Sequence, residues 1–168
     1  MGETALVVLV PEAEPLVATH RSRHDPSATV GVPAHVTLLY PFRSEVDDVA
    51  VGEIGEIAAR ITAFDVAFAQ LGHFPGGVVY LAPSPAEPFH RLIAALMMSF
   101  PDCPPYSGTI SDPVPHLTVA DGVDTATATV LERALRPGLP VTARVERITL
   151  LGQGAADRWI VLRHWPLG

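Results

Sequence analysis

Residues 35–42 read His-Val-Thr-Leu-Leu-Tyr-Pro-Phe, and residues 116–119 repeat the first four positions in kind as His-Leu-Thr-Val. Each copy follows a proline-containing segment and is rich in β-branched and apolar residues, which is typical of a short strand entered from a loop. Because successive side chains of a strand point to opposite faces, His35 and Thr37 share one face, as do His116 and Thr118. The apolar residues can therefore enter a core while the imidazoles and hydroxyls face a cleft.

The surroundings of the two motifs are also alike. An apolar strand, an Ala-Glu-Pro sequence and a helical segment precede each motif, beginning at Leu6 in one case and at Val78 in the other. The motif histidines lie 81 residues apart, and the same alignment pairs Tyr80 with Trp159. We therefore interpret the chain as one domain over residues 1–168 with an internal duplication, approximately 1–82 and 78–168. A pseudo-twofold axis would bring both polar faces to one cleft.

The composition is that of a folded protein. A hydrophobic fraction of 48% and a charged fraction of 17% in 168 residues exclude a disordered chain and suit one domain with a sizeable core. Cys103 is the one cysteine, which excludes an internal disulfide and is compatible with a reducing cytoplasm, where we expect a monomer. The apolar run 5–10 is too short for a signal core or a membrane span, so we expect no membrane association.

The net charge of −7 argues against electrostatic attraction to long duplex nucleic acid. A small nucleotide, or the cyclic phosphate at an RNA end, is compatible with it.

Hydrophobic periodicity and turn residues give a coarse map of the chain. We expect strands near 6–10, 35–39, 64–68, 78–82, 116–119, 141–150 and 158–164, with helices near 15–24, 48–61, 88–97 and 124–135. Proline-rich loops over 25–34 and 101–115 lead into the two motifs.

Paired His-x-Thr-x motifs about eighty residues apart in a small duplicated chain resemble those of the 2H phosphoesterase superfamily. Its members include bacterial 2'-5' RNA ligase-like proteins and cyclic nucleotide phosphodiesterases. The resemblance implies an α+β fold with two antiparallel or mixed sheets that flank a central cleft, with helices outside. It implies that His35, Thr37, His116 and Thr118 are catalytic and that no metal or other cofactor is needed.

Two histidines on opposite sides of a phosphate can divide the work of acid–base catalysis. A neutral imidazole takes a proton from the attacking water or hydroxyl, and a protonated one gives a proton to the leaving oxygen. Thr37 and Thr118 would donate hydrogen bonds to the non-bridging oxygens, where negative charge builds up. Carried over from proteins of similar type, His116 is expected to be the base and His35 the acid.

Other candidate residues are less specific. Arg43, just beyond the first motif, could bind a phosphate or a base, and an exposed loop arginine is an equal alternative. Tyr106 could stack on a base or cover the sheet. His20 and His24 have the i, i+4 spacing of metal ligands, but no His-Glu-x-x-His pattern accompanies them, which favours a solvated helix end.

Three functions are compatible with these residues. The first is a metal-independent phosphoesterase that opens a small cyclic phosphodiester such as a nucleoside 2',3'-cyclic phosphate. The second is 2'-5' RNA ligation or RNA-end processing. In the RNA ligase-like branch of the family an arginine often follows the second motif by a few residues. This chain continues Ala120-Asp121-Gly122 instead, which argues against ligation. The third is a binding module that holds a nucleotide or an RNA end without chemistry.

Overall fold

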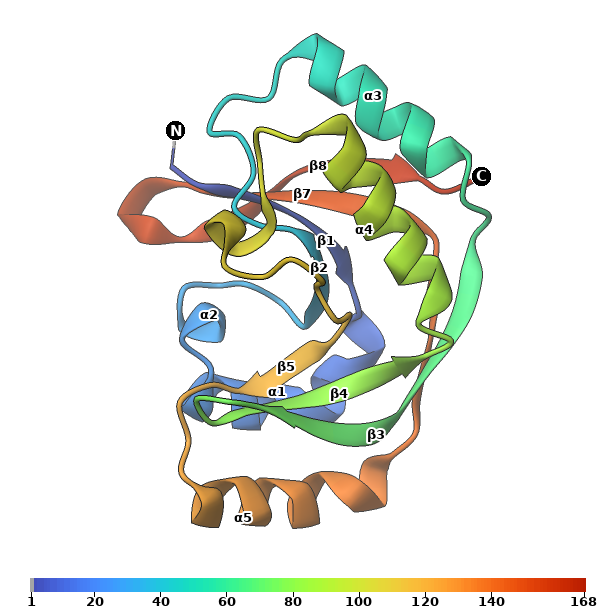
Figure 1. Ribbon diagram of the computed structural model, residues 1–168. Helices are drawn as coiled ribbons and strands as arrows, with labels where there is room; N and C mark the ends of the chain where they lie inside the picture. The colour runs from blue at the N-terminus through green and yellow to red at the C-terminus, as the bar shows by residue number, and fades with distance from the viewer. Residues whose placement is uncertain (1) are drawn as a thin grey trace.

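The computed structural model describes residues 2–168 and contains two four-stranded sheets (Figure 1). The strand orders are β2-β1-β7-β8 in the first sheet and β5-β4-β3-β6 in the second, and all neighbouring strands are antiparallel. Each motif strand is thus an edge strand beside the first strand of its predicted half. The strands are β1 Thr4–Leu9, β2 His35–Leu39, β3 Phe64–Phe74, β4 Val78–Ser84, β5 Leu117–Ala120, β6 Val141–Val145, β7 Arg147–Gln153 and β8 Trp159–Pro166.

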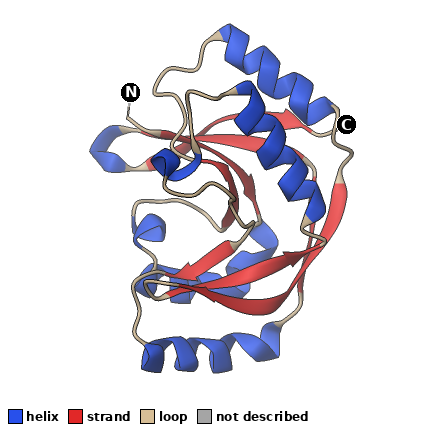
Figure 2. Ribbon diagram, viewed as in Figure 1, coloured by secondary structure: helices blue, strands red, loops and turns tan. Residues whose placement is uncertain are grey.

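Helices flank the two sheets, with α3 and α4 on one side of the molecule and α5 on the opposite side (Figure 2). The predicted α+β class is therefore confirmed, with sheets that are purely antiparallel. Within residues 2–168, no helix combines the length and the hydropathy that crossing a bilayer requires. The α-helices are α1 Glu14–His24, α2 Pro26–Thr29, α3 Asp48–Ala59, α4 Glu87–Ser99 and α5 Thr125–Leu135, and the 3-10 helices are η1 Pro11–Ala13, η2 Pro105–Gly108, η3 Arg136–Gly138 and η4 Ala155–Asp157.

The first helix of each half packs against the motif strand of the other half. Helix α1 follows β1 of the first sheet but contacts β5 of the second, and α4 follows β4 of the second sheet but contacts β2 of the first. Strands β2 and β5 also contact each other. This crosswise packing holds the two motif strands in contact, where an edge of one sheet meets an edge of the other.

The starts of the helices carry capping residues or prolines. The Asp47 carboxylate accepts a hydrogen bond from Ala50 N at 2.8 Å, and that of Asp124 accepts one from Thr127 N at 2.7 Å. Helices α1 and α4 carry a proline in the first turn, where its missing N–H costs no hydrogen bond. The short helix α2 lies where we expected only loop, and Asp25 begins it by accepting from Ser27 N at 3.0 Å.

Two details of the predicted strands are wrong. The segment 141–150 is not one strand, because the chain changes sheets at Glu146: β6 pairs with β3 and β7 pairs with β1. Tyr80 and Trp159 are not equivalent, because β4 is an inner strand and β8 an edge strand. Alternation along a strand shows which face is buried, but strand neighbours are set by distant parts of the chain. The internal duplication stays a prediction.

The main core lies where α3 and α4 cover the sheets, and large fully buried side chains such as Phe68, Phe89 and Phe100 fill it. Phe89 of α4 meets the Phe64 ring of β3 edge-on, with ring centroids 5.1 Å apart. An aromatic side chain in this position joins a helix packed on the first sheet to a strand of the second.

Replacing Phe89 with alanine should lower the free energy of unfolding by about 3–5 kcal/mol, because a fully buried ring is lost and a cavity remains. Met98 in the same helix is 83% exposed, so Met98→Ala should change it by less than about 0.5 kcal/mol. Urea unfolding of both variants measures the difference. Equal losses would contradict the described packing of α4.

Candidate active site

The four motif side chains line a single cavity of about 850 Å³. His35 and Thr37 reach it from β2, Thr118 from β5, and His116 from the residue just before β5. The structure thus brings together residues that the sequence places 81 positions apart.

Each motif histidine is fixed by the same local hydrogen bond. The Nδ1 of His35 lies 2.7 Å from the carbonyl oxygen of Pro33, and the Nδ1 of His116 lies 2.7 Å from that of Val114. A carbonyl oxygen can only accept, so Nδ1 carries the proton in both rings. This tautomer leaves Nε2 as the nitrogen that can accept a proton, and that can donate it once the ring is charged.

Burial makes both imidazoles hard to protonate. Burial, with smaller contributions from the Arg21 guanidinium and the charge of His116, lowers the pKa of His35 to about 4, against the opposing effects of the Pro33 carbonyl and Asp25. Burial also lowers the pKa of His116, against the effect of the Val114 carbonyl. At pH 7 the free protein therefore holds both rings mainly neutral.

The two histidines differ in their neighbours. The His116 ring meets Phe74 edge-on at 4.9 Å between centroids, and Phe74 is stacked on Tyr80 at 4.2 Å. Near His35 lies instead a buried ion pair in which Arg21 Nη2 is 2.9 Å from Asp25 Oδ2. His116 therefore packs against an aromatic ring, whereas His35 lies near a buried ion pair.

The sequence interpretation missed the pair of Arg21 and Asp25. We took the end of the first helix for a solvated segment, whereas both side chains are almost fully buried and Arg21 also donates to Ser27 Oγ at 3.2 Å. The i, i+4 spacing of an arginine and an aspartate just before a proline was the available signal. Asp25 and Ser27 both line the cavity.

Tyr106 lines the cavity from the loop that precedes the second motif. Its main-chain N–H donates to Tyr40 O at 2.6 Å, and burial raises the pKa of its phenol, an effect that the Thr37 hydroxyl opposes. Tyr106 and Ser107 have φ of 49° and 54°, a conformation that costs side-chain-bearing residues of the order of 1–3 kcal/mol each. The loop thus holds Tyr106 beside Thr37.

Arg43 does not line the cavity. Its Nε and Nη2 atoms bind the Asp102 carboxylate at 3.0 and 2.9 Å, and its guanidinium lies 5.1 Å from the centroid of the Phe100 ring. Within residues 2–168, the side chains that line the cavity include no arginine or lysine. Asp121, the second residue after the second motif, does line it.

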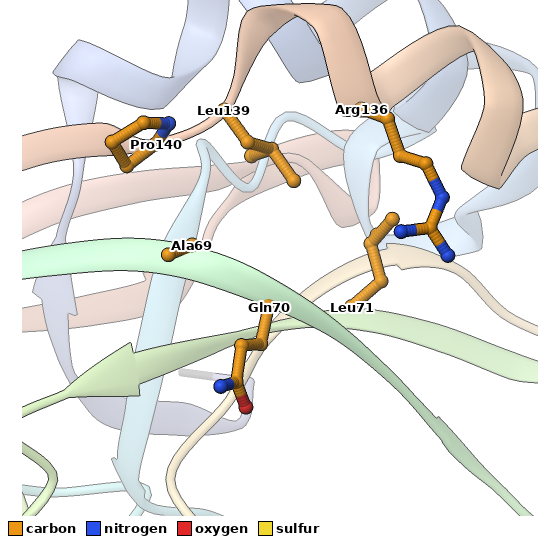
Figure 3. Close-up of a pocket in the computed structure, with 6 residues that line it drawn as sticks. All are labelled: Ala69, Gln70, Leu71, Arg136, Leu139 and Pro140. Atoms are coloured by element: carbon orange, nitrogen blue, oxygen red, sulfur yellow. The ribbon is translucent and has the colours of Figure 1, made fainter.

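A second hollow lies between β3 and the segment that ends at Pro140 (Figure 3). Arg136 is its one charged residue, and the Arg136 Nη2 atom binds Glu132 at 3.1 Å. In residues 2–168 no group of three or more histidine, cysteine, aspartate or glutamate side chains is placed to hold a metal ion. The cavity at the motif strands is therefore the site with paired acid–base groups.

The lowered pKa of His35 should make the folded state sensitive to acid. Between about pH 6.5 and pH 4 the unfolded chain protonates His35 and the folded chain does not, so stability should fall as the pH falls through this window. The contribution is on the order of 3 kcal/mol. His35→Asn, whose amide can replace the Nδ1 donor, should lose that much less stability between pH 7 and pH 4.

Denaturant unfolding of wild type and His35→Asn at both pH values measures this, with His90→Asn, a change of an exposed histidine on α4, as the control. Parallel pH dependence of wild type and His35→Asn would contradict a half-buried His35 imidazole that stays uncharged in the folded state.

Comparisons with known proteins identify a family and structures of similar fold. The family model of the 2'-5' RNA ligase superfamily matches residues 9–157. No curated protein matches the chain in sequence.

Solved structures share the fold at low sequence identity. Escherichia coli LigT complexed with 3'-AMP aligns over 99% of this chain and 98% of its own, with 22% identity and a TM-score of 0.66. LigT complexed with NADP+ aligns over 99% and 97%, with 22% identity and a TM-score of 0.62. A protein described as a phosphoesterase aligns over 99% and 98%, with 20% identity and a TM-score of 0.63. Because the family model covers most of the sequence, the chain belongs to the 2'-5' RNA ligase superfamily of 2H phosphoesterases.

Proposed function

We propose that this protein is a metal-independent phosphoesterase that opens a small cyclic phosphodiester, such as a nucleoside 2',3'-cyclic phosphate. The observation that supports this most directly is the pair of histidines in one cavity, each fixed through Nδ1 with Nε2 left for proton transfer. Simple binding of a phosphate does not require two such groups.

In the proposed reaction, one neutral Nε2 takes a proton from a water molecule as the water oxygen attacks phosphorus. The bond between phosphorus and one ring oxygen breaks, and the other histidine, protonated at Nε2, gives its proton to that oxygen. Water and the cyclic diester become a monoester and a free hydroxyl, so atoms and protons balance. Thr37 and Thr118 donate hydrogen bonds to the non-bridging oxygens as their charge increases.

The surroundings of the rings favour a particular division of labour. We expected His116 to be the base and His35 to be the acid. However, His35 has a pKa of about 4 and a guanidinium nearby, so it is the ring that most resists a charge. We therefore assign the base to His35 and the acid to His116, whose protonated form a bound phosphate anion would favour.

The charge of the cavity favours a small substrate. Its lining carries the carboxylates of Glu3, Asp25, Asp112 and Asp121 without an arginine or lysine. A cyclic diester brings one negative charge, whereas an RNA end brings several, which these carboxylates repel. LigT is described in complexes with 3'-AMP and NADP+, which supports a nucleotide as the ligand here.

The second candidate is 2'-5' RNA ligation or end processing, which the superfamily membership favours. Incubation with RNA oligonucleotides that end in a 2',3'-cyclic phosphate and a 5'-hydroxyl discriminates, because ligation gives longer products and end processing shorter ones. A pure binding module would be stabilised by nucleotides in thermal unfolding without turning over any of them.

Turnover of nucleoside 2',3'-cyclic phosphates in EDTA tests the proposal. His35→Ala and His116→Ala should each lower kcat about 10²- to 10⁴-fold, because each removes one partner of the acid–base pair. His90→Ala, an exposed histidine of α4, is the matched control and should keep wild-type kcat. Unchanged kcat in both motif variants, or loss of all activity on chelation, would sink the proposal.

The pH dependence should be bell-shaped, since one ring must be neutral and the other charged. Both pKa values in the free protein are lowered, so kcat/KM should peak below pH 6.5. The bound phosphate raises both pKa values, so kcat should peak at a higher pH than kcat/KM. A maximum of kcat/KM above pH 7 would contradict this.

Substrates with a good leaving group test the assignment of roles. An aryl phosphodiester with an activated phenol needs no proton on its leaving oxygen, so it should restore much of the activity of His116→Ala and little of that of His35→Ala. The reverse pattern would return the acid role to His35.

A further inference from the structure

Part of the cavity is not used by the proposed chemistry. It continues from Thr37 across the inner face of the first sheet, over Ala5, Val7 and Leu151, and Val32 covers one end. Ala5 lies directly opposite Leu151, and the small alanine side chain leaves room above this part of the sheet. The floor of this region is apolar.

Two aromatic rings stand at the edge of this apolar floor. Tyr40 and Trp159 have ring centroids 6.2 Å apart at an angle of 61°, so a planar group stacked on one ring would meet the other at its edge. Both are tied to the fold, because Trp159 N donates to Val30 O at 2.8 Å and the Tyr40 hydroxyl donates to Glu3 Oε2 at 2.7 Å.

Glu3 lies at the far end of the region, where its carboxylate lines the cavity. The hydrogen bond to Glu3 raises the pKa of Tyr40 to about 12, so the phenol keeps its proton and occupies only part of the carboxylate's capacity. The remaining lone pairs can accept hydrogen bonds from a ligand.

The spacing along β1 suits a nucleotide. Val7 pairs with Thr37, and Glu3 lies four residues before Val7, next to the first residue of β1, which in extended backbone is roughly 13 Å away. A phosphate held at Thr37 would place its sugar over the apolar floor and its base stacked on one of the two aromatic rings and against the edge of the other, with the outer edge of the base at Glu3.

We infer that this region binds the nucleobase of a cyclic nucleotide and that Glu3 selects guanine, an inference that rests on the proposed function. A carboxylate only accepts hydrogen bonds, and the Watson–Crick edge of guanine presents two adjacent donors, N1–H and the amino group. Adenine and cytosine present one amino group beside an acceptor nitrogen. Uracil presents one N–H between two carbonyl oxygens, which the carboxylate repels.

The experiment compares kcat/KM for the four nucleoside 2',3'-cyclic phosphates and for glycerol 1,2-cyclic phosphate, which has no base. Wild type should prefer the guanosine compound to the uridine compound by at least about tenfold, the equivalent of one to two hydrogen bonds at an exposed rim. Glu3→Gln should lower kcat/KM for guanosine about tenfold and leave the glycerol compound unchanged. Glu12→Gln, the same change on an exposed residue outside the cavity, should leave all five values unchanged.

A second variant tests the floor. Ala5→Leu should raise KM for all four nucleotides but not for glycerol cyclic phosphate, whose turnover also shows that the variant folds. Equal kcat/KM for the five substrates in wild type, or an unchanged base preference in Glu3→Gln, would overturn the base site while the proposed function stood.

If wild type turns over none of the five compounds, the proposed function fails, and binding decides the base site. Calorimetry with 3'-GMP and 3'-UMP should then still show tighter binding of 3'-GMP, lost in Glu3→Gln. Equal affinities would overturn the inference.

Discussion

A hydrogen bond from an imidazole Nδ1 to the main-chain carbonyl two residues earlier fixes each motif histidine, and the chemistry of the cavity depends on it. The bond needs only the imidazole and the main-chain carbonyl two residues before it, so each of the two similar motifs forms it. It selects the tautomer with a free Nε2 and removes the rotation of the ring about χ2. Both rings are therefore positioned before a ligand enters, which would lower the reorganisation that the proposed acid–base reaction requires.

The same Nδ1 hydrogen bond occurs at both histidines, but the residues around the two rings differ. Phe74 presents a ring to His116, whereas Arg21 and Asp25 lie near His35. Two chemically identical rings can in this way differ in how readily they take a proton, which is what separate acid and base roles demand. The two similar motifs hold the rings in the same way, and their different neighbours make the two rings differ in how readily they are protonated.

The sequence predicted the elements that depend on local rules. Strand alternation identified the inward faces of the motif strands, and hydrophobic periodicity with turn residues identified the four long helices. Contacts between residues far apart in the sequence could not be predicted from it. Arg43 finds its partner Asp102 59 residues away, and the chain changes sheets at Glu146 without a break in its strand-like composition. Likewise, nothing near Glu3 in the sequence indicates that its carboxylate meets Tyr40.

The crosswise packing of α1 on β5 and of α4 on β2 has a consequence for how the molecule can come apart. A cut between β3 and β4 would leave each fragment with a motif strand whose covering helix belongs to the other fragment. Neither fragment could bury its edge strand alone, so the halves would have to associate to form either histidine strand. Melting should accordingly abolish both histidine strands in one cooperative step rather than half by half.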